Sequence, residues 1–412
     1  NYRRIRACRI CRSDNLVAYL DLGKIPLVNS LIKIEDSQKK EDKFPLEVLY
    51  CKDCSLSQLS IVVNPKIMFL DYVYRSSISK TLRNHFSGMA QKISDIFPLD
   101  KERLVADIAS NDGCLLQQFK MKNFSNLIGV EPAKNLAAIA NTSKIRTINS
   151  FWSANAAKKI ESKYGKAKII TATNVFAHVD DLHHFLEGVC ILLDEDGLFI
   201  VEVPYLCDLI EKNEFDTIYH EHLSYFLLKP IKRLFESFNL KIVGVDKHLM
   251  HGGTIRIYAS KSDINADAHK SLEKFLALER DRGLYNIKTY EGLSAKAKKV
   301  KKDLLKILGR LKKDNKKAAA YGASAKGNVL LNYCGIGKDL IEFIIDDTPE
   351  KQNKLAPGSK IPIKDAGYLE KEKPDYLVLL AWNFAEELMN KTKSHQERGG
   401  KYIIPIPEVR VV

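Results

Sequence analysis

Hydrophobic segments and segments with helical periodicity alternate along the middle of the chain. Short apolar runs predict seven strands, at residues 104–109, 126–130, 145–148, 168–173, 198–203, 241–245 and 253–259. A tight turn at 110–113 and a helix at 114–120 follow the first strand. This alternation predicts an α/β fold with a mostly parallel sheet. The last two strands lie too close together for a crossover helix, so the sheet should end in an antiparallel hairpin.

A second strand–turn–helix pattern lies near the C-terminus. It predicts a strand at 318–323, a turn at 324–327, a helix at 328–334 and a strand at 341–345. Before it, an amphipathic helix is predicted within 294–317, where apolar residues recur at helical spacing: Val300, Leu304, Ile307, Leu308 and Leu311. A chain of 412 residues is too long for one core, so we expect two or three domains.

Composition and charge change this picture little. With 45% hydrophobic and 28% charged residues the chain is an ordinary globular protein. No apolar run approaches the roughly 20 residues that span a bilayer, and the first residues have no apolar signal core, so we expect a cytoplasmic protein. The net charge is +14, and the 294–317 segment alone holds ten Lys and one Arg against two Asp. A solvated linker helix accounts for this, with a nucleic-acid or membrane surface as the alternative.

Four of the eight cysteines form two knuckles, Cys8-x-x-Cys11 and Cys51-x-x-Cys54. Paired knuckles supply the four thiolates of a tetrahedral zinc site. Short predicted strands at 16–20 and 46–50 could not form a core of their own without a metal. Two redox pairs are the alternative, but neither knuckle opens a helix in a βαβ pattern.

The first strand of the middle region carries a candidate cofactor site. Glu131 ends the second strand, 24 residues after Asp107, which fits a carboxylate that binds a ribose diol. The intervening loop contains one glycine, Gly113, and is a poor phosphate cradle. A nucleoside without phosphates is therefore favoured over a dinucleotide.

The richest chemistry lies in residues 218–226, which contain Tyr219, His220, Glu221, His222 and Tyr225. The window follows a strand that ends at Pro204, and loops after strand C-termini hold ligands in α/β sheets. So many groups that can transfer protons indicate an active site, with a zinc or buried polar cluster as the alternative.

The C-terminal pattern also carries a candidate binding loop. Ser324 and Lys326 lie in a small-residue loop before a helix, which suits a diphosphate. The spacing from Gly322 to Asp346 would also allow NAD, although a full glycine fingerprint is missing, and a purely structural role remains open.

Four motifs together resemble those of the nucleotide-sugar C-methyltransferases: residues 107–113, 174–179, 219–222 and 251–256. The resemblance runs from the first knuckle to residue 405, with alanine at position 109 where the family commonly has glycine. It implies a zinc-binding domain at 1–70, a class I S-adenosylmethionine-dependent methyltransferase core at 71–262, and a Rossmann-like nucleotide-sugar-binding domain with the basic helix at 263–412.

The resemblance also implies residue roles. His222 would be the general base, Glu221 would orient or polarise it, Tyr219 and His178 would hold hydroxyl or oxyanion positions, and Tyr74 would close the site. The alternative for His178 is a helix-end histidine near Asp180 and Asp181. For the cofactor, Glu131 would bind the ribose and Asn149 the adenine, unless Asn149 is only a turn residue. The remaining cofactor residues are Asp107, Ala109, Asn111, Gly113 and Asn174, and the nucleotide sugar would meet Tyr321, Ser324 and Lys326.

The implied function is methyl transfer from S-adenosylmethionine to a ring carbon, C3, of a nucleotide-diphosphate 4-keto-6-deoxy sugar through an enolate. A zinc-ribbon RNA methyltransferase and a non-enzymatic cofactor-binding scaffold are the alternatives. We expect the keto sugar nucleotide as partner, with neither nucleic acid nor membrane.

Overall fold

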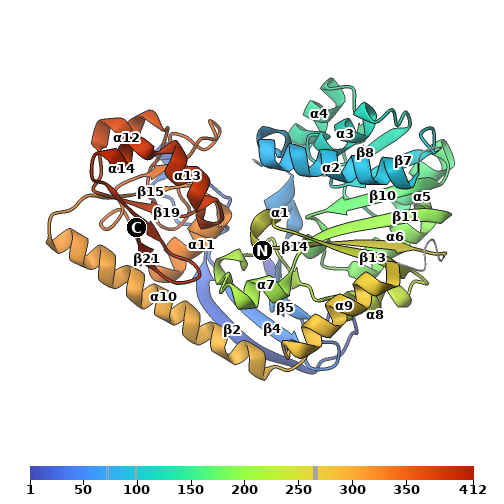
Figure 1. Cartoon of the computed structure of the whole chain (residues 1–412), viewed down its shortest axis with the longest axis horizontal. Helices are drawn as coiled ribbons and strands as arrows, with labels where there is room; N and C mark the ends of the chain where they lie inside the picture. The colour runs from blue at the N-terminus through green and yellow to red at the C-terminus, as the bar shows by residue number, and fades with distance from the viewer. Residues whose placement is uncertain (71, 73, 98–99, 263–267) are drawn as a thin grey trace.

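The computed structural model describes residues 1–70, 72, 74–97, 100–262 and 268–412. The proposed domain boundaries at 71 and 263 therefore lie outside the described residues. Three main sheets lie side by side, in the N-terminal, middle and C-terminal parts of the chain (Figure 1). Among the described residues no helix is both long and apolar enough to cross a bilayer.

The middle part is built on a seven-stranded sheet in the order β13-β14-β11-β10-β7-β8-β9. Its strands are β7 (Leu104–Ile108), β8 (Leu127–Val130), β9 (Thr147–Ile148), β10 (Ala167–Thr173), β11 (Leu193–Pro204), β13 (Lys241–His248) and β14 (Thr254–Ser260). β14 pairs antiparallel with both β11 and β13, whereas the neighbours from β11 to β9 are parallel. The predicted parallel sheet with a terminal hairpin is confirmed. Its strands are almost fully buried, as expected for a sheet covered on both faces.

Helices cover both faces of this sheet (Figure 1). They are α2 (Lys80–Ile96), α3 (Cys114–Met121), α4 (Lys134–Thr142), α5 (Ala154–Tyr164), α6 (Leu182–Leu192), α7 (Leu206–Glu211) and α8 (Leu228–Glu236). The short 3₁₀ turns η3 (Phe176–His178), η4 (Phe215–Thr217) and η5 (Met250–Gly252) follow the strand ends. α1 (Pro65–Phe69) and η2 (Ser76–Ile78) connect this part to the N-terminal sheet.

The N-terminal part has a four-stranded antiparallel sheet in the order β12-β5-β4-β2. Its strands are β2 (Leu16–Ile25), β4 (Phe44–Cys51), β5 (Ser57–Leu59) and β12 (Ser224–Tyr225). β12 belongs to the histidine-rich window, so that window is attached to the N-terminal sheet through the pairs Ser224↔Gln58 and Tyr225↔Ser57. A second pairing joins β1 (Tyr2–Arg4) to β6 (Ile61–Val63).

The C-terminal part has a six-stranded sheet in the order β18-β16-β15-β19-β20-β21. Its strands are β15 (Ala318–Tyr321), β16 (Ile344–Ile345), β18 (Ile363–Lys364), β19 (Tyr376–Leu379), β20 (Lys401–Ile404) and β21 (Arg410–Val411). Its helical segments are α11 (Ala325–Cys334), α12 (Gly367–Glu372), η6 (Trp382–Phe384), α13 (Ala385–Lys391) and α14 (Lys393–Glu397). The turn predicted at 324–327 is wrong: Ser324 is the N-cap, accepting from the Gly327 amide, so the helix begins at Ala325 and Lys326 lies in its first turn.

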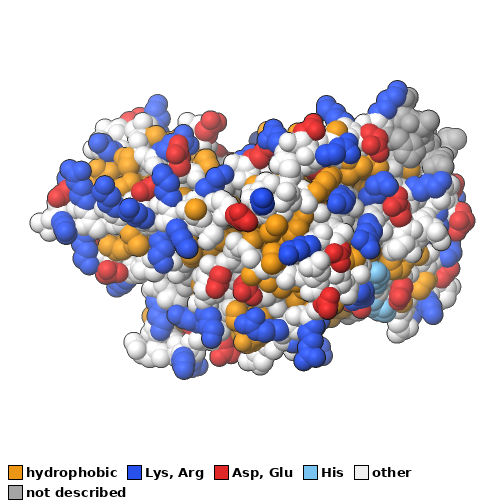
Figure 2. All heavy atoms as spheres, turned by 90° about the horizontal axis from the view of Figure 1, so that it is seen from below, with side chains coloured by type: hydrophobic (Ala, Val, Ile, Leu, Met, Phe, Trp, Pro, Cys, Tyr) orange, Lys and Arg blue, Asp and Glu red, His pale blue; other side chains and the backbone are white. Residues whose placement is uncertain are grey.

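Two helices connect the middle and C-terminal parts, α9 (Ala268–Asp281) and α10 (Lys288–Lys313). The apolar residues predicted for the amphipathic helix face inward, with Val300, Leu304, Leu308 and Leu311 buried. Lys and Arg side chains gather on the side of the molecule along which α10 runs (Figure 2). The excess positive charge therefore lies largely on the solvated face of one connecting helix.

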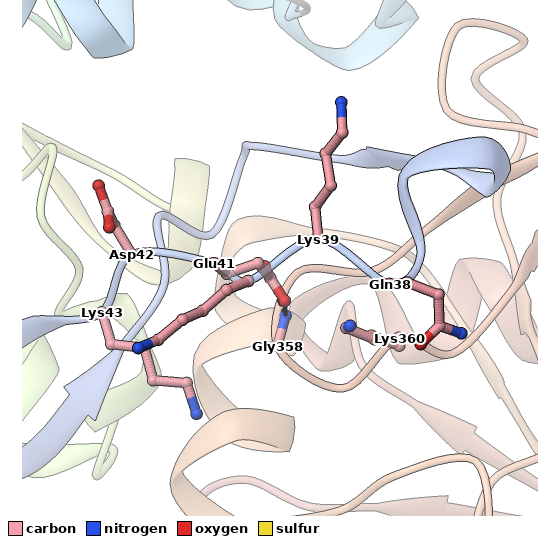
Figure 3. A pocket seen from close by; sticks show the side chains of 8 residues that line it. Gln38, Lys39, Glu41, Asp42, Lys43, Gly358 and Lys360 are labelled. Atoms are coloured by element: carbon pink, nitrogen blue, oxygen red, sulfur yellow. Dashed lines mark hydrogen bonds between the residues drawn. The ribbon is translucent and has the colours of Figure 1, made fainter.

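Direct contacts also tie the N-terminal part to the C-terminal part. β3 (Ile32–Lys33) pairs antiparallel with β17 (Lys354–Leu355), and the side-chain amide of Asn328 donates to the Val28 carbonyl at 2.8 Å. Near this pairing both carboxylate oxygens of Glu41 accept from the Gly358 amide at 3.0 Å, beside a lysine-rich pocket (Figure 3). The N-terminal part thus contacts the middle part through β12 and the C-terminal part through the β3–β17 pairing.

Candidate active site and metal site

The four knuckle cysteines come together at the edge of the N-terminal sheet. Their sulfur atoms all lie within 4.8 Å of one another, with Cys8 and Cys54 at 3.5 Å and Cys11 and Cys51 at 3.5 Å. A disulfide is about 2.05 Å long, and the sulfurs of a tetrahedral zinc site with bonds of about 2.3 Å lie about 3.8 Å apart. The cluster has the spacing of a metal site, and three of its cysteines are buried.

The predicted cofactor loop leaves β7 through an unusual backbone. Ala109, Asn111 and Gly113 all have positive φ, at 56°, 52° and 79°. This explains why β7 ends at Ile108, one residue before the predicted strand end, and why glycine suits position 109: a Cβ is strained in the left-handed region. The hydroxyl of Ser110, which is 3% exposed, has no hydrogen-bond partner among the described residues. An orphaned polar atom in a contorted loop is typical of a ligand cradle.

Two acidic residues line this loop. Asp107 is buried and accepts from the Thr171 hydroxyl at 2.6 Å, and burial raises its pKa to about 7. The carboxylate of Glu131 accepts from the amides of Asn111 and Ala133, both at 2.8 Å, and burial raises its pKa. Glu131 is thereby held beside the loop, and a carboxylate has further lone pairs for two ribose hydroxyls.

Asn149 and Asn174 frame the same strand ends. The side-chain amide of Asn149 donates to the carbonyls of Glu131 and Pro132, each at 2.9 Å, so its oxygen is the atom suited to an adenine amino group. Asn174 follows β10 with φ 56°, and its backbone N–H donates to the Glu202 carbonyl at 2.9 Å. Both residues therefore lie at strand C-termini, as the sequence predicted.

The segment around Tyr74 lies against the cofactor loop. The Asn111 side chain donates to the Tyr74 carbonyl at 3.1 Å and accepts from the Ser76 amide at 3.0 Å, and Ser77 donates to the Asp112 carboxylate. The Tyr74 side chain itself is 47% exposed. The tyrosine of this segment that reaches the histidine-rich window is Tyr72, whose hydroxyl donates to Glu221 at 2.9 Å.

Glu221 lies at the junction of the N-terminal and middle parts. Its other oxygen accepts from the side-chain amide of Asn29 at 2.6 Å. Burial raises the pKa of Glu221 to about 7, so near neutrality this carboxyl group can either hold or release a proton. The sequence analysis missed Asn29 and Tyr72, since nothing local connects them to Glu221, 192 and 149 residues away.

His222 is buried among aromatic rings. Its ring centroid lies 4.0 Å from that of Tyr219 and 5.0 Å from that of His178. Its Nδ1 lies 2.9 Å from the Thr217 carbonyl, which can only accept, so Nδ1 carries a hydrogen and Nε2 is the nitrogen that holds the lone pair in the neutral form of the ring. The Thr217 carbonyl thus fixes Nδ1 of the ring, and the orienting or polarising role of Glu221 stays a prediction.

Two groups whose rings lie beside His222 are neutral at pH 7. Burial lowers the pKa of His178 to about 4, and burial raises the pKa of Tyr219. Tyr219 and Tyr72 therefore remain hydrogen-bond donors. His220 lies apart from this set: its Nε2 is 3.2 Å from the carbonyls of Phe44 and Pro45, so it fixes the window to β4.

The three residues predicted for the nucleotide sugar do not form one open surface. Tyr321 is buried and donates to Asp347 at 2.9 Å, and Ser324 caps α11. The Lys326 ammonium lies 3.7 Å from the Glu214 carboxylate and 4.7 Å from the centre of the Trp382 ring. The Lys326 ammonium therefore forms an ion pair with a carboxylate of the middle part of the molecule.

One described pocket lies away from the predicted site residues, and another adjoins them. The pocket of Figure 3 is lined by residues 38–43, Gly358 and Lys360, none of which belongs to the predicted sets. The other is lined by His85, His248 and Phe384, among others, between α2, the end of β13 and η6. His85 binds Glu202 at 2.6 Å, and the Glu202 carbonyl accepts from Asn174, so this second pocket adjoins the strand ends of the site.

Comparisons with known proteins cover the whole chain. The family model described as a zinc binding domain matches residues 8–69, that of a methyltransferase domain 82–245, and that of the C-methyltransferase C-terminal domain 249–407. C-methyltransferase NovU from Streptomyces niveus is 37% identical over 410 residues, 100% of this chain and 97% of that protein.

Solved structures give only partial likenesses. Magnesium protoporphyrin IX methyltransferase ChlM from Synechocystis PCC 6803 with bound SAH has a TM-score of 0.34 at 10% identity, over 44% of this chain and 83% of that one. Plantazolicin methyltransferase BpumL in complex with SAH has a TM-score of 0.35 at 13% identity, over 44% and 86%.

The matched domains and the geometry agree on two cofactors. S-adenosylmethionine is the cofactor of the middle part, whose loop after β7 and carboxylate after β8 fit a nucleoside. Zinc is the metal of the N-terminal part, where four thiols fit tetrahedral coordination.

Proposed function

Because the chain belongs to the sugar C-methyltransferase family and acts as an S-adenosylmethionine-dependent C-methyltransferase, we propose that its acceptor is C3 of a nucleotide-diphosphate 4-keto-6-deoxy sugar. Bound S-adenosylmethionine supplies an electrophilic methyl group. A C–H next to a ketone becomes nucleophilic only after a base removes its proton and donors stabilise the resulting enolate oxygen. The residues around His222 match both requirements.

In this proposal His222 removes the C3 proton through Nε2. The observation that carries it is the hydrogen bond from Nδ1 of the buried ring to the Thr217 carbonyl, which leaves Nε2 as the ring nitrogen that would take the proton. Tyr219, whose ring centroid lies 4.0 Å from that of His222, and His178 are the neutral groups beside it that would hold sugar oxygens. Glu221 would take up or release a second proton, since burial raises its pKa to about 7.

The cofactor side would be arranged by the loop after β7. Glu131 would bind the ribose hydroxyls, the Asn149 oxygen the adenine amino group, and the loop from Asp107 to Gly113 the methionine portion. Asn174 lies at the adjoining strand end, between this loop and the pocket beside His85. The backbone of residues 74–77 is hydrogen-bonded to the side chains of Asn111 and Asp112, which holds this segment over the cofactor loop. Its side chains would therefore exclude water above the transferred methyl group.

The experiment is turnover with keto-deoxy sugars linked to thymidine, guanosine, uridine and cytidine diphosphates. We expect one nucleotide series to give S-adenosylhomocysteine and a C-methylated sugar with the new methyl on C3 by NMR. In heavy water with S-adenosylhomocysteine, the enzyme should wash deuterium into C3 faster than an enzyme-free control. Methylation at oxygen or at another carbon would contradict the proposed acceptor, as would turnover confined to RNA.

A further inference from the structure

The turn η4 places two buried acidic residues against the C-terminal part of the molecule. Asp216 is fully buried, and its carboxylate accepts from the Trp382 indole N–H at 2.6 Å across 166 residues of chain. Glu214 is 3% exposed and lies 3.7 Å from the Lys326 ammonium. Burial raises the pKa of both carboxyl groups, and the charge of Lys326 opposes this rise. The C-terminal part thus compensates charges that the turn could not otherwise keep buried.

The same turn is clamped by ring contacts. Phe215 packs edge-on against Tyr333 of α11, with ring centroids 5.4 Å apart, and the Trp382 ring lies under Lys326 at 4.7 Å. Within the turn, the Thr217 amide donates to the Glu214 carbonyl at 3.0 Å and the Ile218 amide to the Phe215 carbonyl at 3.1 Å. A short hydrogen-bonded turn moves as a unit, so its position follows from its partners in the C-terminal part.

One atom of this turn reaches the reaction centre. The Thr217 carbonyl, adjacent to Asp216 in the chain, accepts from Nδ1 of His222 at 2.9 Å. A covalent and hydrogen-bonded path therefore leads from the Trp382 indole through Asp216 and Thr217 to the imidazole. Asp216, Thr217 and His222 are buried and Trp382 is half-buried, and each step is a specific contact within the protein.

We propose that Trp382 and Asp216 are positioning residues for His222: the C-terminal part aims the base by holding the turn whose Thr217 carbonyl fixes the imidazole. The inference rests on the proposed role of His222. It gives the C-terminal part a task in catalysis that is separate from binding the nucleotide. A base displaced by about 1 Å loses up to 10²-fold in rate, which is the effect that Trp382 would prevent.

Trp382→Phe tests this by removing the N–H while keeping a ring beneath Lys326. We expect kcat to fall roughly 10- to 100-fold, while the KM values for both substrates and the affinity for S-adenosylmethionine stay unchanged. Tyr402→Phe is the matched control. It deletes a buried hydroxyl of the same domain that donates to the Thr392 carbonyl at 2.9 Å, far along the chain from η4, and should leave kcat unchanged.

Asp216 provides a second pair of variants, should Trp382→Phe fold poorly. Asp216→Asn keeps an oxygen that can accept from the indole and should retain most of kcat, whereas Asp216→Ala should lose as much as Trp382→Phe. Equal losses in the two variants, in proteins of equal thermal stability, would overturn the proposal, because a pure packing role does not distinguish asparagine from alanine in this way.

A double-mutant cycle separates this inference from the function on which it rests. In single turnovers, Trp382→Phe should not slow methyl transfer further in the His222→Asn background. The same factor in both backgrounds would mean that Trp382 acts on the substrate directly, as neighbouring pocket residues Asn383 and Phe384 could, and would overturn the inference alone. Full activity of His222→Asn would instead remove the assigned base and, with it, any positioning role for Trp382.

Discussion

The cofactor loop and the cluster formed by His178, Tyr219, Glu221 and His222 are both built from strand ends. They differ in how far apart in the chain their contacting residues lie. The loop is local: Asn111 reaches Glu131 over 20 residues, and Asn149 reaches the Glu131 carbonyl over 18. The cluster is assembled over 149 residues for Tyr72, 166 for Trp382 and 192 for Asn29. The contacts of the proposed nucleoside site therefore lie within the consecutive strands β7, β8 and β9, whereas those of the proposed acceptor site come from all three parts of the chain.

This difference predicts that the two regions respond independently to damage. Changes in the N- or C-terminal part should affect methyl transfer while cofactor affinity persists. Changes in the loop should affect cofactor affinity while the base remains in place. For each variant, both the rate of methyl transfer and the affinity for S-adenosylmethionine should be measured, because a change that lowers both would remove the difference between the two regions.

Removal of zinc should have the largest effect. Structural zinc contributes about 10–16 kcal/mol of apparent binding free energy in small domains, and the sheet it stabilises carries the β5–β12 pairing and Asn29. Chelation, or Cys51→Ser, should abolish methylation and lower thermal stability, whereas S-adenosylmethionine should still bind in calorimetry. Cys190→Ser, outside the cluster, is the control and should keep about one zinc per chain. Purified protein with almost no zinc would contradict the assignment.

His222→Asn should have the next largest effect. Loss of a positioned base lowers the rate by about 10² to 10⁴, so methylation and enzyme-dependent deuterium exchange at C3 should both collapse with unchanged cofactor affinity. His220→Asn is the matched control from the same window, because His220 contacts only backbone carbonyls of β4 among its described hydrogen bonds. It should lower the melting temperature but retain exchange. Exchange near the wild-type rate in His222→Asn would move the base to Tyr219 or His178.

Glu131→Ala should weaken cofactor binding by roughly 1.5–3 kcal/mol, the range for hydrogen bonds to a charged group. Calorimetry would measure this as a rise in the dissociation constant of S-adenosylmethionine, with the geometry of the base unaltered and saturating cofactor restoring much of the rate. Glu187→Ala, on the exposed face of α6, is the control for removing one carboxylate. Unchanged affinity in folded Glu131→Ala would place the ribose elsewhere.

Ala109→Gly should have the smallest effect. An L-residue at φ 56° pays about 1 kcal/mol that glycine avoids, so denaturant unfolding should show a gain of up to about that size, with rate and affinity unchanged. Ala106→Gly, in the extended strand of the same unit, should destabilise by roughly 0.5–1 kcal/mol. If both variants lose stability, the left-handed backbone at Ala109 carries no strain.

The sequence alone determined whatever depends on periodicity and short spacing. Alternating strands and helices gave the α/β core and its terminal hairpin, and knuckles of two cysteines gave the metal site. A carboxylate one βαβ unit after Asp107 predicted where the cofactor binds. These features follow from contacts between residues close in the chain, where a pattern of residue types constrains the geometry directly.

Only the tertiary structure decided which groups hold Glu221, Asp216 and the His222 ring in place. Asn29, Tyr72 and Trp382 have no local pattern that distinguishes them from other polar or aromatic residues, and the Thr217 carbonyl is a backbone atom that no sequence motif can mark. The same holds for Lys326, which the sequence predicted in a diphosphate-binding loop but which lies in the first turn of α11 with its ammonium 3.7 Å from the Glu214 carboxylate. Such contacts depend on how three sheets pack together, and burial then sets the protonation of the groups that meet there.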